Sequence, residues 1–305
     1  MTETSPVLQT EHPDPRYASI ELWPTATILD ALAEAQMAAT ALVRAAVPSL
    51  EVAVEAALPR LRDGGRLFYV GAGTAGRVGM QDGVELTPTY GWPAERLVML
   101  LAGGSGAVSQ AAEGAEDDEA TARAEMAAHH VGPHDVVFGI AASGNTPYTC
   151  AALSAGRAAG ALTIGISCVP EARLLREAEC GITLPTGSEA VAGSTRLKAG
   201  TAQKAALNLL STTLMIRLGH VYQGLMVDMR VTNAKLARRA IGMVRRLAGG
   251  SDEEIGAALK QAGGNVKRAV LLRHGMSLDQ AEQALEAARG DLHIVLKSRT
   301  AGGIG

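Results

Sequence analysis

The stretch "RLFYVGAGTAGRVG", residues 66–79, is an apolar run that ends in a glycine-rich turn, and it indicates the type of fold. Within it, residues 71–76 carry glycine at the G-x-G-x-x-G spacing, and a helical pattern follows from about Ala75. Glycines allow a backbone to approach an anion closely, and the free N–H groups at a helix N-terminus bind phosphate. The stretch therefore predicts a strand, a turn that binds a phosphate group, and a helix.

Further short apolar runs follow, each separated from the next by a polar or helical segment. They cover residues 96–102, 135–142, 162–168 and 180–185. Strands that are apolar along their whole length and alternate with helices are typical of a parallel sheet covered on both faces. We therefore predict an α/β fold with a doubly wound parallel sheet. Between its strands we expect a long helix that follows Gly103 and Gly104 and reaches about His130, and another beginning near Thr146.

Helical patterns flank the predicted sheet on both sides. Residues 28–61 are expected to form two helices divided at Pro48, since proline interrupts a helix interior. A long helix is expected over 194–218, and capping boxes at Ser251 and Ser277 begin helices near the C-terminus. In chain order we expect an N-terminal segment and helix (1–49), a sheet domain (50–225), a connecting helix (226–250) and a small three-helix domain (251–305).

Composition limits the partners of this chain. The net charge is −3, which gives no general attraction to nucleic acid or an anionic membrane. Three cysteines without a C-x-x-C pair, and a polar start without a signal-peptide profile, favour a cytoplasmic protein. The apolar stretches are expected to be too short or too interrupted to span a bilayer. The four arginines of residues 238–246 are interpreted as a solvated helix face, and the histidines of 129–134 as a helix end rather than a metal site.

A dinucleotide is disfavoured at the first glycine turn. An NAD site needs an acidic residue at the end of the following strand to hold the ribose. Here that strand ends in "LLAGGSG", residues 100–106, without Asp or Glu. Two interpretations of the turn remain: it binds some other phosphate, or it is simply a tight connection between a strand and a helix.

A second turn carries a clearer phosphate pattern. "GIAASGNTPY", residues 139–148, leaves an apolar run and enters a helix, with Thr146 at the expected N-cap and Pro147 in the first turn. Ser143 and Thr146 then offer hydroxyl groups beside free helix amides, which suits a phosphomonoester. Because the carboxyl ends of neighbouring parallel strands share one edge of a sheet, we expect both turns to face one crevice.

Several stretches together resemble a known family. They are "GAGTAGRVG" (71–79), "ELTPTYG" (85–91), "AAEGAEDD" (111–118), "GIAASGNTPY" (139–148), "GSTRLKAGTAQK" (193–204) and "MVDMRVTNAKL" (226–236). In order and spacing they resemble the N-acetylmuramic acid 6-phosphate etherases, which carry a sugar isomerase domain on a flavodoxin-like sheet. The resemblance implies a lyase of peptidoglycan recycling that eliminates D-lactate from C3 of a ring-opened phosphosugar and then adds water. It also implies a homodimer, a UBA-like C-terminal domain and no cofactor.

The resemblance assigns roles to particular residues. The proton donor of the family corresponds to Glu85, and its second carboxylate to Glu116. From the residues alone, Glu116 belongs to an acidic run at 113–119, which a solvated helix face would also explain. The substrate and phosphate contacts implied are Gly73, Thr74, Ser143, Gly144, Asn145, Thr146, Ser194, Thr195 and Lys198.

Some of these positions have a second interpretation. Ser194 or Thr195 could act as the N-cap of the long helix, with Lys198 exposed. Glu189 could be a ligand or could order that turn. In the family's glycine turn a serine usually stands where this chain has Ala75.

Other functions fit the same expected scaffold. An aldose–ketose phosphosugar isomerase would need a base, which Glu85 or Glu116 could supply, but no acid for a leaving group. A non-catalytic phosphosugar sensor, like the glucokinase regulatory protein, would bind without reacting, although such sensors usually duplicate the domain. A DNA-binding regulator is disfavoured by the acidic pI of about 6.2. Release of lactate separates the etherase from all of these.

Overall fold

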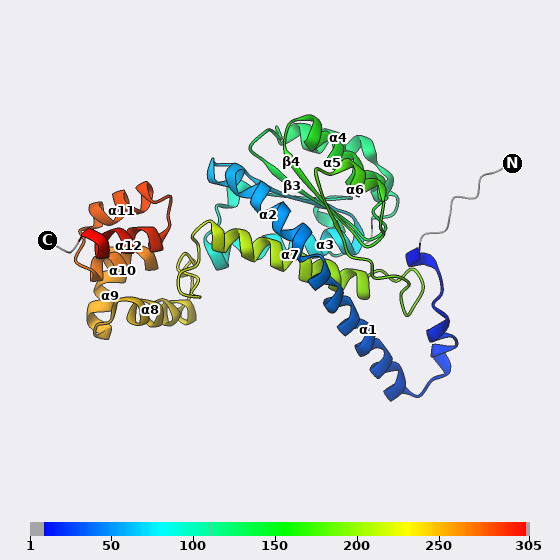
Figure 1. Ribbon diagram of the computed structural model, residues 1–305, viewed down its shortest axis with the longest axis horizontal. Coiled ribbons are helices and arrows are strands. Elements are labelled where there is room, and N and C mark those ends of the chain that lie inside the picture. Colours follow the sequence, from blue (N-terminus) through cyan, green and yellow to red (C-terminus); the bar gives the residue numbers. More distant parts are fainter. Residues whose placement is uncertain (1–8, 111, 303–305) are drawn as a thin grey trace. The chain divides into compact units, whose positions relative to one another are not determined.

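The computed structural model describes residues 9–110 and 112–302, drawn as a ribbon in Figure 1. The chain divides into two compact units. The first unit comprises Met1–Gly83 and Glu95–Leu210, and the second comprises Val84–Ala94 and Ser211–Gly305. The first unit contains the sheet, and the second is helical in its described part.

The sheet of the first unit has five parallel strands in the order β2-β1-β3-β4-β5. The strands are β1 (Leu67–Gly71), β2 (Leu97–Leu101), β3 (Val136–Ala141), β4 (Leu162–Ser167) and β5 (Cys180–Thr183). Each of the five expected apolar runs is a strand, so the predicted doubly wound parallel sheet is confirmed. The order 2-1-3-4-5 is that of flavodoxin-like folds, in which ligands bind at the carboxyl edge between β1 and β3.

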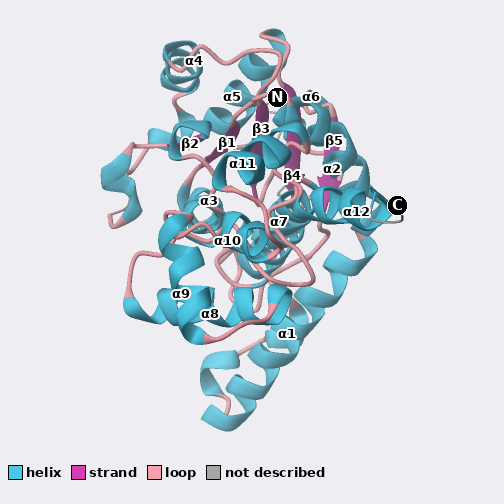
Figure 2. Cartoon of the chain, turned by 90° about the vertical axis from the view of Figure 1, so that its left-hand side faces the viewer, coloured by secondary structure: helices cyan, strands magenta, loops and turns pink. Residues whose placement is uncertain are grey.

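Helices cover both faces of the sheet (Figures 1 and 2). The helices of the first unit, including two that continue into the second, are α1 (Thr25–Ala45), α2 (Val47–Arg62), α3 (Gly73–Tyr90), α4 (Glu119–Ala128), α5 (Pro147–Ala158), α6 (Arg173–Glu177) and α7 (Lys198–Arg217). Helices α4, α5 and α6 lie on one face, and α2, α3 and α7 on the other. The expected division of the N-terminal helical pattern is confirmed, with Pro48 in the first turn of α2.

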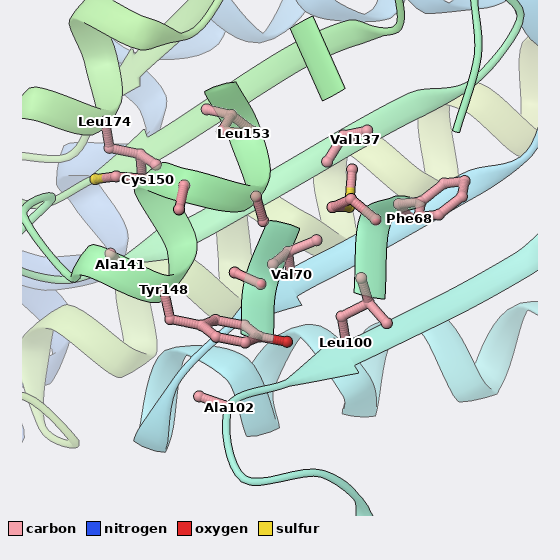
Figure 3. Packing of buried hydrophobic residues seen from close by; sticks show 14 of the residues in the cluster. Phe68, Val70, Leu100, Ala102, Val137, Ala141, Tyr148, Cys150, Leu153 and Leu174 are labelled. Atoms are coloured by element: carbon pink, nitrogen blue, oxygen red, sulfur yellow. The ribbon is translucent and has the colours of Figure 1, made fainter. Parts of the chain in front are cut away.

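A continuous apolar core joins the sheet to α4, α5 and α6. Figure 3 shows side chains from β1, β2 and β3 packed against this helical layer. Phe68 and Val137 are fully buried in the sheet, and Leu153 of α5 and Leu174 of α6 are fully buried above it. On the opposite face, a Cβ at Gly79 of α3 would lie 2.6 Å from Cδ1 of Ile140. The lack of a side chain there therefore lets α3 lie directly on the sheet.

The prediction of a long helix after Gly104 that reaches about His130 is wrong. The segment instead contains 3₁₀ turns at Ser105–Val108 and Ala115–Asp117, and α4 begins only at Glu119. Gly104 and Gly114 have positive φ angles of 70° and 72°, which end any helix. Asp118 then starts α4, because its carboxylate accepts the N–H of Thr121 at 2.9 Å.

The second unit has its own core. Its helices are α8 (Ala234–Ala248), α9 (Asp252–Gln261), α10 (Val266–Arg273), α11 (Leu278–Ala287) and α12 (Leu292–Gly302). Both expected capping boxes are confirmed, at Ser251 with Glu254 and at Ser277 with Gln280. The three expected C-terminal helices are present, and α12 follows them as a fourth that the sequence patterns did not indicate. The arginines of α8 are exposed, as predicted.

Candidate active site

A cavity of about 500 Å³ lies at the carboxyl ends of β1 and β3 in the first unit. Its size is ordinary for a small-molecule site. The lining residues are Thr10, Glu11, Ala72, Gly73, Thr74, Ala75, Glu116, Asp117, Ala141, Ala142, Ser143, Asn145, Thr146, Pro147, Thr195 and Gln203. Residues of both predicted phosphate turns are among them. The expectation that the two turns face one crevice is therefore confirmed.

The turn after β3 presents free hydroxyl groups to this cavity. Thr146 occupies the N-cap of α5, but its side chain makes no capping hydrogen bond. The Ser143 hydroxyl accepts the Asn145 N–H at 3.2 Å and keeps its own proton to donate. The Asn145 side chain accepts the N–H of Arg173 at 3.0 Å, which holds the turn against α6. The turn is therefore ordered while its hydroxyls remain available to a ligand.

Gly144 shapes this turn rather than lining the cavity. Its N–H donates to the carbonyl oxygen of Ala141 at 3.2 Å, and its φ angle is +65°. A Cβ at this position would lie 2.3 Å from Oγ of Ser167 and 2.4 Å from Cβ of Ala172. No side chain fits there without displacing its neighbours.

We expect Gly144→Ala to lower the free energy of unfolding by about 2–4 kcal/mol, through left-handed strain plus overpacking. Chemical denaturation of both proteins measures the loss. Gly132→Ala is the control, because a Cβ there meets no atom closer than 4.0 Å. We expect that variant to change the free energy by less than about 0.5 kcal/mol. Equal losses in the two variants would contradict the close packing around Gly144.

The turn after β1 supplies the other side of the cavity. Gly73, with a φ angle of +52°, begins α3 immediately after the strand. Gly73, Thr74 and Ala75 all line the cavity. The N-terminal amides of α3 and the Thr74 hydroxyl are therefore positioned at the same opening as the turn after β3.

In the acidic run at 113–119, some residues line the cavity, and others make hydrogen bonds within the protein. Glu116 and Asp117 lie on the 3₁₀ turn at Ala115–Asp117 and line the cavity, so Glu116 is not on a helix face. Hydrogen bonds from Thr121 lower the pKa of Asp118. Bonds from Arg173, at 2.7 Å, and from Arg123 lower the pKa of Glu119.

By contrast, the exposed Glu116 carboxylate makes no hydrogen bond or ion pair with any residue in the described part of the chain. Of the acidic run, Glu116 is thus a carboxylate that both faces the cavity and is free to act on a ligand.

Glu85 lies elsewhere on its helix. It is exposed on α3 and is not among the residues that line the cavity. It follows Gly73 by twelve residues, a separation of about 18 Å along a helix that rises 1.5 Å per residue. Of the two predicted carboxylates, Glu116 therefore lines the cavity of the first unit, whereas Glu85 belongs to the second unit.

The segment before α7 differs from the expected helix start at Ser194. Helix α7 begins at Lys198, where the buried Glu189 carboxylate accepts the N–H groups of Lys198 and Ala199 at 3.0 and 2.9 Å. Glu189 thus orders the turn, the second of its two interpretations. Lys198 is 5% exposed, and its ammonium group donates to the Thr186 carbonyl oxygen at 2.9 Å. Thr195 lines the cavity, whereas Ser194 and Lys198 do not.

Sequence patterns missed several lining residues. Thr10 and Glu11 belong to the irregular N-terminal segment, which no motif marked. Gln203 is a fully buried polar residue on a helix rich in alanine and leucine. A single amide side chain in such a helix could have been noticed in the sequence, although the sequence does not show what the amide faces.

Comparisons with known proteins agree with this arrangement. Residues 49–157 match the model of the glucokinase regulatory protein N-terminal SIS domain, and residues 115–213 match the SIS domain. A solved phosphoheptose isomerase from Francisella tularensis superposes with a TM-score of 0.47 at 14% identity, over 64% of this chain and all of that one. This score is too low to add to the assignment.

Curated relatives match nearly the whole chain. The N-acetylmuramic acid 6-phosphate etherase of Deinococcus radiodurans is 50% identical over 289 residues, which cover 94% of this chain and 95% of the relative. Proteins of the same name from Rubrobacter xylanophilus and Salmonella typhimurium are 43% and 41% identical, with at least 94% of each chain covered. Because identity this high extends over both units, the chain belongs to the N-acetylmuramic acid 6-phosphate etherase family.

Proposed function

We propose that this chain is a cytoplasmic enzyme that cleaves the D-lactyl ether of N-acetylmuramic acid 6-phosphate. The products are N-acetylglucosamine 6-phosphate and D-lactate, as in peptidoglycan recycling. The observation that carries the proposal is the free Glu116 carboxylate in a cavity with two phosphate-type turns, in a chain 50% identical to an etherase over 94% of its length.

The reaction needs two proton carriers. In the ring-opened sugar the aldehyde acidifies the proton at C2. A base removes this proton, the bond from C3 to the lactyl oxygen breaks, and an acid protonates the departing oxygen. Water then adds to the unsaturated aldehyde, with its oxygen at C3 and a proton returned to C2. Each step exchanges only protons and one water molecule, so two carboxyl groups suffice.

Within this scheme Glu116 acts at C2 and Glu85 protonates the leaving oxygen. Glu116 is supported by its place in the cavity and by the lack of a structural partner among the described residues. Glu85 is supported by the family resemblance, since it does not line the cavity of its own chain. We infer that a second copy of the protein supplies this second carboxyl group.

The phosphate group binds at the two glycine turns. The hydroxyls of Ser143 and Thr146, with the Asn145 backbone, take one side, and Gly73 with Thr74 takes the other. Both helix N-termini add positive dipole. Thr195 contacts the sugar directly. Ser194 and Lys198 hold the turn that carries Thr195, consistent with the Lys198 bond to Thr186.

A homodimer through α1 would also cover an exposed apolar surface. Leu29 and Met37 of this helix are 63% and 66% exposed. Among the described residues, α1 is the one helix that is long and apolar enough to cross a membrane by length and composition alone, which the sequence analysis did not expect. Asp30 and Glu34 are exposed on the same helix, which favours protein and water as its surroundings over lipid.

Release of D-lactate from N-acetylmuramic acid 6-phosphate by the purified protein tests the proposal. We expect turnover without added metal or cofactor, and equal amounts of lactate and N-acetylglucosamine 6-phosphate. The control is incubation with N-acetylglucosamine 6-phosphate alone, which an isomerase would convert and an etherase would not. Tight binding of the sugar phosphates without lactate release would instead make the chain a sensor.

A further inference from the structure

Gln203 on α7 is a buried carboxamide with unmet hydrogen bonds. Its side chain is 0% exposed, and neither Nε2 nor Oε1 has a partner among the described residues. Burying an amide without partners is unfavourable, because its bonds to water are lost and not replaced. Nearly all buried polar side chains in folded proteins are paired, so an unpaired one needs an explanation. Gln203 lines the cavity, and the explanation lies there.

Thr10 is a second such group at the same place. Of the buried side chains with unpaired polar atoms in residues 10–110 and 112–298, Gln203 and Thr10 are the two that line the cavity. Thr10 is 1% exposed. Its backbone is held in place because its carbonyl oxygen accepts the Gly193 N–H at 3.0 Å. Two unpaired groups from distant segments, meeting at one cavity, indicate a polar ligand rather than a packing defect.

The chemistry of the amide narrows the ligand group. Nε2 donates and Oε1 accepts, so a phosphate or carboxylate would satisfy the first and repel the second. A neutral group with both a donor and an acceptor satisfies both. The cavity is also lined by small apolar side chains, Ala72, Ala75, Ala141 and Ala142. An acetamido group combines an N–H, a carbonyl oxygen and a methyl group, and it matches this lining better than a hydroxyl does.

We propose that Gln203 binds the acetamido group at C2 of the sugar and selects N-acetylated sugar phosphates over those with a hydroxyl at C2. The identity of the sugar rests on the proposed function. In this arrangement the two turns bind the phosphate, and Gln203 binds the substituent at C2. Fixing that substituent also fixes the carbon whose proton is removed.

Binding measurements test this without requiring turnover. Calorimetry compares N-acetylglucosamine 6-phosphate with glucose 6-phosphate, which has the same phosphate and a hydroxyl at C2. We expect Gln203→Met to weaken binding of the acetylated sugar roughly 10- to 100-fold and to leave glucose 6-phosphate within about twofold. Gln81→Met is the matched control, because Gln81 is exposed on α3 and does not line the cavity; it leaves both affinities unchanged.

Stability distinguishes a binding role from a structural one. If Gln203 serves a ligand, replacing its unpaired amide with a thioether of similar size leaves the Tm of the free protein unchanged or raises it. A lower Tm would overturn the proposal, as would equal weakening of both sugars or no change in either. Gln203→Leu repeats both measurements with a branched apolar side chain, and we expect the same loss of affinity without a lower Tm. Failure of the proposed function is seen separately, as absence of lactate release by the wild-type protein.

Discussion

Replacing Glu116 with glutamine is expected to reduce D-lactate release by about a thousandfold, the range for loss of a general acid or base. The substitution keeps the size of the side chain and removes its ability to take the proton from C2. Because Glu116 is exposed and makes no bond within the described residues, the Tm should not change. We also expect the affinity for N-acetylglucosamine 6-phosphate to stay within about threefold, since the turns that hold the phosphate are intact.

Glu113→Gln is the matched control for this experiment. Glu113 belongs to the same acidic run and is exposed, but it does not line the cavity. It should retain full activity. A comparable loss in both variants would mean that the charge of the run matters and not a proton transfer by Glu116. Full activity of Glu116→Gln would remove Glu116 from the mechanism.

Combining two inactive variants in one dimer is expected to restore part of the activity. We expect Glu85→Gln alone to be as inactive as Glu116→Gln, because the lactyl oxygen then departs without a proton. If each active site takes Glu116 from one copy and Glu85 from the other, a mixed dimer of the two variants contains one intact site. Random mixing of subunits should then restore about one quarter of the wild-type rate.

Coexpression of differently tagged subunits and two-step purification provide the mixed dimer for this test. The recovered dimer should then have about half the wild-type rate, because one of its two sites is intact. Mixed dimers without any recovery would mean that both carboxylates come from the same chain. A purely monomeric protein that is fully active would contradict the shared site and the role of α1 together.

The sequence predicted the parts of the fold that local patterns determine. Each strand is apolar along its whole length, and the glycine turns after β1 and β3 mark the edge where the cavity lies. The helix prediction was wrong between Gly104 and Glu119 because alanine and acidic residues favour helices. The positive φ at Gly114 and the cap at Asp118, which interrupt the helix, depend on the surrounding chain. Local composition does not report such breaks.

The candidate site was predictable only in part for a similar reason. The residues of the two turns, Ser143 and Thr146 among them, follow from local spacing, because strand, turn and helix are consecutive. Thr10 and Gln203 reach the cavity through the packing of distant segments, so their own segments do not show what they face. The sequence left two interpretations of Glu189, and its bonds to the N-terminus of α7 decide between them. Glu116 was found through the family resemblance, since in the sequence alone it is one acidic residue among several.

We propose that the cavity of this chain supports elimination of lactate followed by hydration. The most direct measurement is turnover of N-acetylmuramic acid 6-phosphate in water enriched in ¹⁸O, with the label at each carbon read from ¹³C NMR shifts. We expect released D-lactate that has gained no ¹⁸O, and N-acetylglucosamine 6-phosphate with ¹⁸O at C3. Lactate that carries the label, with unlabelled C3, would show cleavage on the lactyl side of the ether and would contradict this mechanism. Absence of lactate would contradict etherase activity itself.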